Sequence, residues 1–259
     1  MSADRLRQLG TVVLFVVTVA VNAAANALPI NGQQTGEISD RFSVLVVPAA
    51  YVFAIWGVIY VFLLLFTVFQ ALPSNADDPL LRDLGWLPAL TGVLNTAWLL
   101  LFHYEVFVLT VPVMVALLVT LIVIHGRIRA RRRDLDTIRR WVVATPFSIY
   151  LGWITVATIA NVAQTLSALG FDGFGIQPEL IASAVLALGL AIALTFVWRF
   201  RDAAYGLVIV WAYVGIVVKE SATDLVPIVA GLGAAAVAVL VLLVLVGRLP
   251  RSPEAMPAR

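Results

Sequence analysis

Aromatic and amide side chains recur at helical spacing inside three apolar stretches of this 259-residue chain. Side chains three or four positions apart share one face of a helix, so each stretch presents a stripe of such groups. Rings offer flat apolar walls, while asparagine amides and indole N–H groups need hydrogen-bond partners in a dry interior. The stripes could line a pocket for a flat molecule, or they could bond one another and hold helices together. The residues are Trp56 and Tyr60 in the first stretch, Asn95 and Trp98 in the second, and Tyr150, Trp153, Ala157 and Asn161 in the third.

Groups that carry acid–base, nucleophilic or metal chemistry are scarce in the sequence. It has no cysteine, which excludes disulfides and thiolates, and its two histidines, His103 and His125, fall at predicted helix ends. We expect His103 and Glu105 to be solvated groups in a turn that follows a helix. The sequence therefore indicates no catalytic residue, no metal site and no cofactor, and it does not favour an enzymatic function.

The elements that must position the stripes are predicted to be transmembrane helices. Hydrophobic residues make up 62% of the chain and charged residues 12%, which excludes an ordinary soluble domain. Uncharged stretches approach the ~20 residues that cross a bilayer, and the third and seventh are shorter. Lipid offers no partner to an unpaired backbone group, so we expect an all-α integral membrane protein with about eight transmembrane helices. The stretches are residues 9–28, 44–70, 87–102, 106–124, 141–166, 180–198, 203–218 and 225–246.

The basic residues predict how these helices are oriented. If all eight stretches cross, fifteen of the 17 Lys and Arg residues lie on one side, and only Arg41 and Lys219 lie on the other. Cytoplasmic loops carry such an excess, so we expect both termini in the cytoplasm of a multi-pass protein of the plasma (inner) membrane. The arginine-rich loop at residues 126–140 is expected to contact anionic membrane lipid. This imbalance reflects topology, and it indicates no nucleic-acid partner.

The character of the stretches changes near residue 170. Tryptophan, tyrosine, asparagine and proline occur inside the earlier stretches, whereas the sixth and eighth consist almost entirely of Ala, Leu, Val and Gly. Polar and aromatic helices line sites, and featureless ones face lipid or close a bundle. We therefore divide the chain into a five-helix bundle at residues 1–168, three additional transmembrane helices at 169–249, and a cytoplasmic tail at 250–259.

The tryptophans fall into two classes. Trp86, Trp141 and Trp198 lie at the ends of their stretches, where an interfacial aromatic belt explains them. Trp56, Trp98 and Trp153 lie inside their stretches, where a belt does not explain them. Spacing alone leaves open whether these inner indoles and the two asparagines line a pocket or only join helices.

Three motifs occur in order along the chain: Pro48, Trp56 and Tyr60; Leu94, Asn95, Trp98 and Phe102; and Pro146, Tyr150, Trp153, Ala157 and Asn161. Together they resemble the tryptophan-rich sensory protein and translocator protein family, also called peripheral-type benzodiazepine receptors. The resemblance implies a five-helix bundle over roughly residues 9–168, with a pocket under the loop at residues 29–47, and a homodimer. It also implies binding of tetrapyrroles such as porphyrins, sterols or other apolar molecules, with Trp56, Asn95, Trp98, Trp153 and Ala157 at pocket-lining positions.

The expected function is a membrane receptor or sensor that binds a flat apolar or amphipathic ligand. The expected ligand resembles a tetrapyrrole, a sterol or an isoprenoid, and Trp56, Tyr60, Asn95, Trp98, Trp153, Ala157 and Asn161 are expected to line its pocket. A transporter of small amphipathic molecules is the alternative, although no ionisable residue lies deep in a span to couple an ion gradient. A membrane enzyme and a retinal photoreceptor using Lys219 are less favoured alternatives.

Overall fold

The computed structural model describes residues 2–132 and 135–249, and within them all regular secondary structure is helical apart from an isolated Ile30–Gln33 bridge. Arg133, Asp134 and the predicted tail at residues 250–259 lie outside the described residues. The chain forms two compact units. The first comprises the residues up to Val44 together with Phe53–Phe171, and the second comprises Leu45–Val52 together with the residues from Asp172 onward.

Among the described residues, six helices are long and apolar enough to cross a membrane, and two further apolar helices are shorter. The protein is therefore a multi-pass, all-α membrane protein, and the full count of eight spans stays a prediction. The six long segments are Ala3–Ala27, Ala50–Ala71, Phe107–Ala130, Thr137–Ala168, Pro178–Phe200 and Leu225–Leu245, and the shorter helices are Leu87–His103 and Ala203–Lys219.

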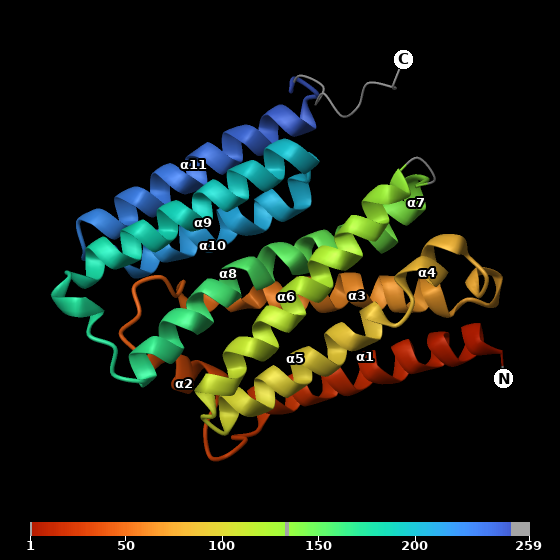
Figure 1. Cartoon of the computed structure of the whole chain (residues 1–259), viewed down its shortest axis with the longest axis horizontal. Coiled ribbons are helices and arrows are strands. Elements are labelled where there is room, and N and C mark those ends of the chain that lie inside the picture. Colours follow the sequence, from red (N-terminus) through yellow and green to blue (C-terminus); the bar gives the residue numbers. More distant parts are fainter. Residues whose placement is uncertain (1, 133–134, 250–259) are drawn as a thin grey trace. The chain divides into compact units, whose positions relative to one another are not determined.

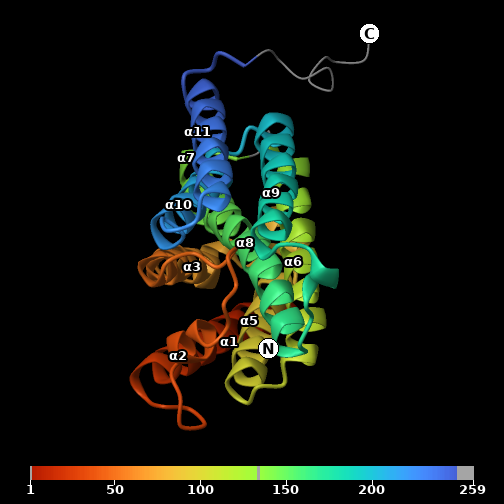
Figure 2. The same ribbon diagram turned by 90° about the vertical axis from the view of Figure 1, so that its left-hand side faces the viewer.

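The first unit contains five long helices that pack in a closed ring (Figure 1 and Figure 2). Helix α1 packs against α3 and α5, α5 against α6, α6 against α8, and α8 against α3. This order surrounds one interior, toward which the polar and aromatic stripes can turn. The long helices are α1 (Ala3–Ala27), α3 (Ile55–Ala71), α5 (Leu87–His103), α6 (Phe107–Ala130) and α8 (Thr145–Ala168); the short elements are α2 (Thr35–Asp40), η2 (Pro73–Asn75), α4 (Pro79–Leu84), α7 (Thr137–Arg139) and a π-helical turn, η4 (Arg140–Ala144). The 3-10 helix η1 (Ala50–Ala54) begins in the second unit and ends in the first.

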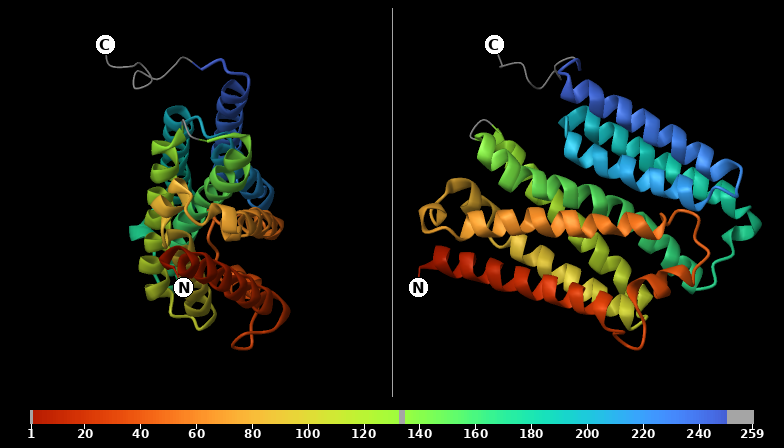
Figure 3. Two further views of the ribbon diagram at one scale, coloured as in Figure 1. Left: turned by 90° about the vertical axis from the view of Figure 1, so that its right-hand side faces the viewer. Right: turned by 180° about the vertical axis from the view of Figure 1, so that it is seen from behind.

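The second unit consists of three long helices that pack side by side (Figure 3). They are α9 (Pro178–Phe200), α10 (Ala203–Lys219) and α11 (Leu225–Leu245), preceded by the short turn η5 (Gly173–Gly175). The Tyr213 hydroxyl donates to the Leu186 carbonyl at 2.7 Å and so joins α10 to α9. A Cβ on Gly233 would come within 2.9 Å of the Tyr213 ring, so a glycine lets α11 approach α10 closely.

The segment Leu45–Val52 packs on α10, although it precedes α3 in sequence. The Ala49 amide donates to the Gly215 carbonyl at 3.1 Å, and the Trp211 indole donates to the Val52 carbonyl at 3.0 Å. A Cβ on Gly215 would lie 2.1 Å from Val52 Cγ2, so only glycine fits beneath the segment. The apolar stretch at 44–70 is thus not one helix, because its first residues find their backbone partners on α10 and α3 begins at Ile55.

Candidate functional site

Asn95 of α5 is buried in a hydrogen-bonded group that spans the interior of the first unit. Its Oδ1 accepts a 2.8 Å bond from Asn22 of α1, and Asn22 also donates to the Thr18 carbonyl at 2.9 Å. The Asn95 side chain also hydrogen-bonds to the Tyr150 hydroxyl of α8. Asn95 is 1% exposed. Its amide bonds to groups of the protein itself and so links α5 to α1 and α8.

Asn161 of α8 is similarly buried, but only one of the two polar atoms of its side chain has a hydrogen-bond partner among the described residues. Its Nδ2 donates to Thr110 Oγ1 of α6 at 2.9 Å, and Thr110 in turn donates to the Phe107 carbonyl at 2.6 Å. Among the described residues, nothing donates to Asn161 Oδ1, although the side chain is 2% exposed. An unpaired buried acceptor of this kind costs about 1–3 kcal/mol, so a partner from outside the protein would be favoured there.

An aromatic group forms where α3 meets α8. The Trp56 ring stacks on Tyr60 of the same helix with centroids 5.5 Å apart, and it meets Tyr150 and Trp153 of α8 edge-on at 5.8 and 6.2 Å. Phe53 also meets Trp153 edge-on, with ring centroids 5.6 Å apart. The structure therefore brings Trp56, Tyr60 and Trp153 together, as edge-to-face rings prefer.

Trp98 of α5 belongs to a different row of rings. It stacks on Phe102 at 5.2 Å, and Phe102 continues through Phe107 at 5.7 Å to Phe42 at 5.3 Å. Ala157 is half-buried on α8, one turn after Trp153. The seven predicted residues thus lie in separate contacts of one bundle: Trp56, Tyr60 and Trp153 in one ring group, Trp98 in another, Asn95 bonded toward α1, Asn161 bonded toward α6, and Ala157 one turn after Trp153.

Four of these seven predicted residues have a buried polar atom without a hydrogen-bond partner in the described part of the chain. Most buried polar atoms in proteins are paired, so each of these four atoms could bind a group from outside the protein. The other two atoms of this kind belong to Arg7 and Ser183. The four are the Tyr60 hydroxyl, the Trp98 and Trp153 indole N–H groups, and Asn161 Oδ1.

The exposure of the tryptophans follows their two predicted classes in part, because Trp56 and Trp98 are half-buried and only Trp153 of the inner three is buried. Trp86, Trp141 and Trp198, at the ends of apolar helices, are 49%, 60% and 53% exposed, whereas Trp153 is 2% exposed. Amphipathic rings at helix ends suit the membrane interface. The inner tryptophan belongs to the bundle interior.

A loop and α2 are held against the turn between α5 and α6 at one end of the first unit. His103 is fully buried: its Nδ1 donates to the Ile30 carbonyl at 3.3 Å, and its Nε2 lies 2.8 Å from Thr35 Oγ1. Glu105 accepts from Gln33 at 2.7 Å and from Arg41 at 2.8 Å. The Gln33 hydrogen bond and then Arg41 lower the pKa of Glu105. The expectation that His103 is solvated is wrong, because the folded loop covers it.

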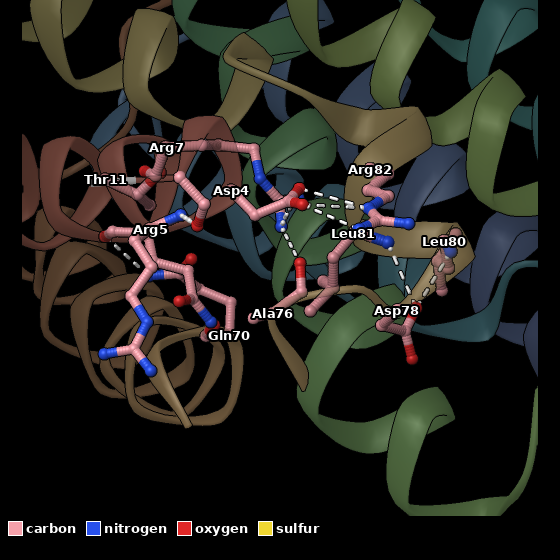
Figure 4. A network of polar contacts seen from close by, with 12 residues as sticks. Asp4, Arg5, Arg7, Thr11, Gln70, Ala76, Asp78, Leu80, Leu81 and Arg82 are labelled. Atoms are coloured by element: carbon pink, nitrogen blue, oxygen red, sulfur yellow. Dashed lines mark hydrogen bonds and ion pairs between the residues drawn. The ribbon is translucent and has the colours of Figure 1, made fainter. Parts of the chain in front are cut away.

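The opposite end of the first unit carries a network of ion pairs and hydrogen bonds (Figure 4). Arg82 reaches Asp4 at 2.7 Å, and the buried Arg7 donates to the Ala76 carbonyl at 2.9 Å. Asp78 caps α4 and pairs with Arg139 at 2.7 Å. Burial opposes ionisation of Asp78, but the Arg139 hydrogen bond and two backbone N–H groups outweigh it and lower its pKa. This network joins three segments that the sequence predicts on one side of the membrane.

A small cavity of about 30 Å³ lies within the first unit, between α1, α3, α5 and α8. Tyr60 is the predicted site residue on its lining, and Tyr150 also faces it. The volume suits one or two groups of the size of water, and not a large ring system.

The sequence reasoning missed the partners Asn22 and Thr110. Asn22 is an amide inside an apolar stretch, and that signal could have identified it. Thr110 carried no comparable signal, because threonine also satisfies itself on its own helix.

Comparison with known proteins supplies one positive finding. No curated protein and no solved structure matches the chain. The family model described as TSPO-like protein matches residues 8–246, which is nearly the whole chain and includes both units. The resemblance seen in the three motifs is thereby confirmed, and the chain belongs to the TSPO-like protein family.

Proposed function

We propose that this protein is a membrane receptor or sensor that binds a flat apolar or amphipathic molecule in the interior of its first unit. The ligand would contact Trp56, Tyr60, Trp98, Trp153, Ala157 and Asn161, and Asn95 would hold the wall behind them. Membership of the TSPO-like family supports a membrane protein for apolar ligands. A tetrapyrrole, sterol or isoprenoid is the expected class.

The observation that carries this proposal is the set of unpartnered polar atoms on three helices. Tyr60 lies on α3, Trp98 on α5, and Trp153 and Asn161 on α8, and the described residues leave each of them one buried atom to pair. Residues that only join helices would bond one another, as Asn22 and Asn95 do. Aromatic side chains provide the apolar walls of a pocket, and three donors and one acceptor among them can fix the orientation of a flat ligand.

The membrane arrangement proposed with this function has eight spans and both termini in the cytoplasm of the plasma (inner) membrane. The ion-pair network of Asp4, Arg82 and Arg139 supports it, because these residues come from segments predicted on one side. We also propose a homodimer, and a role for residues 169–249 as helices added to a five-helix bundle at residues 1–168.

Quenching of tryptophan fluorescence by protoporphyrin tests the proposal on the full-length protein. Saturable quenching should weaken in Trp153→Phe and in Ala157→Leu, because the first removes an indole N–H and the second fills the space one turn away. Trp198→Phe is the matched control, since Trp198 is exposed at a helix end. Equal quenching in all three variants would show that the porphyrin only partitions into detergent, and it would overturn the site.

A further inference from the structure

The face of α10 that meets the segment Leu45–Val52 is built around Trp211 and Gly215, which are one helical turn apart. The Trp211 indole donates to the Val52 carbonyl at 3.0 Å, and the Gly215 carbonyl accepts from the Ala49 amide at 3.1 Å. Residues four positions apart share a face of a helix, so both contacts belong to one side of α10. The segment is therefore attached to this face at two backbone positions.

The packing at this attachment is close as well as hydrogen-bonded. Val52 is fully buried, and a Cβ on Gly215 would lie 2.1 Å from its Cγ2, so Val52 has no room to move toward α10. The Tyr51 ring meets the Trp211 ring edge-on, with centroids 5.3 Å apart. Backbone bonds, a β-branched side chain and a ring thus restrain the segment against the same face.

The bond to Val52 also restrains its neighbour Phe53. The Val52 carbonyl belongs to the peptide unit that ends at the Phe53 Cα, and a peptide unit is planar, so a bond to its oxygen limits where that Cα can lie. The Phe53 ring meets Trp153 of α8 edge-on at 5.6 Å, and Trp153 meets Trp56 at 6.2 Å. Trp211 therefore restrains, through one peptide plane, a residue that contacts Trp153.

We propose that Trp211 is a positioning residue for the ring group at Trp56 and Trp153, and that it acts through residues 49–52. Phe53 forms a further part of the wall of that site. The inference rests on the proposed function, because that function makes Trp56 and Trp153 ligand contacts. It gives α10 a role in binding: the helix holds the segment, and the segment holds Phe53.

Trp211→Phe tests the inference on the full-length protein in nanodiscs, because phenylalanine keeps a ring beside Tyr51 and removes the donor to the Val52 carbonyl. We expect the protoporphyrin concentration at half-maximal quenching of tryptophan fluorescence to rise roughly threefold to tenfold, the effect of about one net hydrogen bond. The midpoint is compared and not the amplitude, since the variant lacks one fluorophore. Trp198→Phe, at an exposed helix end, controls for that loss.

Tyr213→Phe is the matched control for stability. The Tyr213 hydroxyl donates to the Leu186 carbonyl of α9 at 2.7 Å, so this variant also removes one hydrogen bond of α10. Tyr213 is two residues from Trp211, which places it on a different face of the helix from the segment. A general weakening of α10 would affect both variants alike, whereas positioning predicts that Trp211→Phe alone shifts the midpoint.

A second measurement follows Phe53 without a ligand. Phe53 is replaced by 4-fluorophenylalanine, and its fluorine resonance is recorded. The ring lies edge-on to the Trp153 indole, whose ring current makes the resonance sensitive to small displacements. We expect the resonance to move or broaden in Trp211→Phe and to stay in place in Tyr213→Phe.

A second pair of variants decides if thermal unfolding shows that Trp211→Phe has not folded. Gly215→Ala crowds Val52 on the same face and should move both the resonance and the quenching midpoint. Gly231→Ala, whose Cβ would meet only Val217 at 3.8 Å, should move neither.

The two measurements separate this inference from the proposed function. An unmoved resonance, or equal changes in Trp211→Phe and Tyr213→Phe, would overturn the inference. A moved resonance together with saturable quenching at an unchanged midpoint would also overturn it and would leave the receptor intact. A moved resonance in a protein that shows no saturable quenching would sustain Trp211 as the positioning residue and remove tetrapyrroles from the proposed ligand class.

Discussion

Replacing Asn95 and Asn161 by leucine, one at a time, should have opposite effects on stability. Asn95→Leu removes the acceptor of the 2.8 Å bond from Asn22 and the hydrogen bond to Tyr150, and it leaves both groups buried. A bond between membrane helices contributes about 0.6 kcal/mol on average and up to about 1.7 kcal/mol. With two such bonds lost, we expect the free energy of unfolding to fall by about 1–2 kcal/mol.

Asn161→Leu should leave stability unchanged or raise it by up to about 1 kcal/mol. It removes one bond to Thr110, whose hydroxyl still donates to the Phe107 carbonyl at 2.6 Å. It also removes the unpaired Oδ1, whose burial costs about 1–3 kcal/mol, more than a bond between helices of about 0.6 kcal/mol contributes. The same variant should lose the stabilisation by ligand, which reaches about 2.7 kcal/mol for the native protein at a hundredfold excess over Kd.

Unfolding by sodium dodecyl sulfate, followed by circular dichroism on the full-length protein in mixed micelles, measures both effects. Asn26→Leu is the control, since Asn26 bonds only the Asn22 carbonyl of its own helix and is exposed. We expect its effect to stay within about 0.5 kcal/mol. If Asn161→Leu destabilises the protein as much as Asn95→Leu does, then Asn161 only joins helices, and the pocket loses its acceptor.

Three further predictions concern the contacts around this interior. Gly215→Ala should destabilise the protein by about 1–3 kcal/mol, because its Cβ would lie 2.1 Å from Val52 Cγ2, whereas Gly231→Ala meets only Val217 at 3.8 Å and should be neutral; thermal unfolding compares the two. The Glu105 contacts lower its pKa, so their contribution to stability is present above the ordinary value of 4.5 and is lost as the pH falls through the lower folded value; the protection factors of the amides in the loop at residues 30–41, which are corrected for the intrinsic pH dependence of hydrogen exchange, should fall in acid, and Glu105→Gln should abolish that dependence. Asp78→Ala should cost about 1–3 kcal/mol in detergent unfolding, because Asp78 both caps α4 and pairs with Arg139, while Asp136→Ala, at an exposed partner of the same arginine, should cost less than half as much.

Much of the fold could be predicted from the sequence, because apolar length and the absence of charge are direct consequences of the bilayer. The helical stripes also carried the family motifs, since Trp56, Trp98 and Trp153 recur at fixed spacing from a proline or an amide. The start of α3 could not be predicted in this way. Residues 45–52 are as apolar as the helix that follows. They stay outside it because two of their backbone groups hydrogen-bond to residues of α10, which is distant in sequence.

The burial of His103 could not be predicted from the sequence either. A histidine at the end of an apolar helix has the same local sequence whether it meets water or a covering loop. Here Thr35 and Ile30 supply partners to both ring nitrogens, and they come from a loop some seventy residues earlier. These groups come together only in the folded bundle. Packing of α1 against α5 places the loop that follows α1 beside the turn that follows α5.

The two explanations for buried amides, joining helices and lining a pocket, apply to different residues of the same bundle. Periodicity places Asn95 and Asn161 alike, since it fixes the face of a helix and not the partner across it. The partner depends on which helices are neighbours in the ring: α5 meets α1, where Asn22 completes the amide, and α8 meets α6, where Thr110 satisfies only one atom. The unpaired atom of Asn161 is therefore a consequence of helix order, and the same order leaves the indole N–H of Trp153 among aromatic rings, without a nitrogen or oxygen acceptor among the described residues. A ligand that accepts from Trp153 and donates to Asn161 would complete what the neighbouring helices leave unpaired.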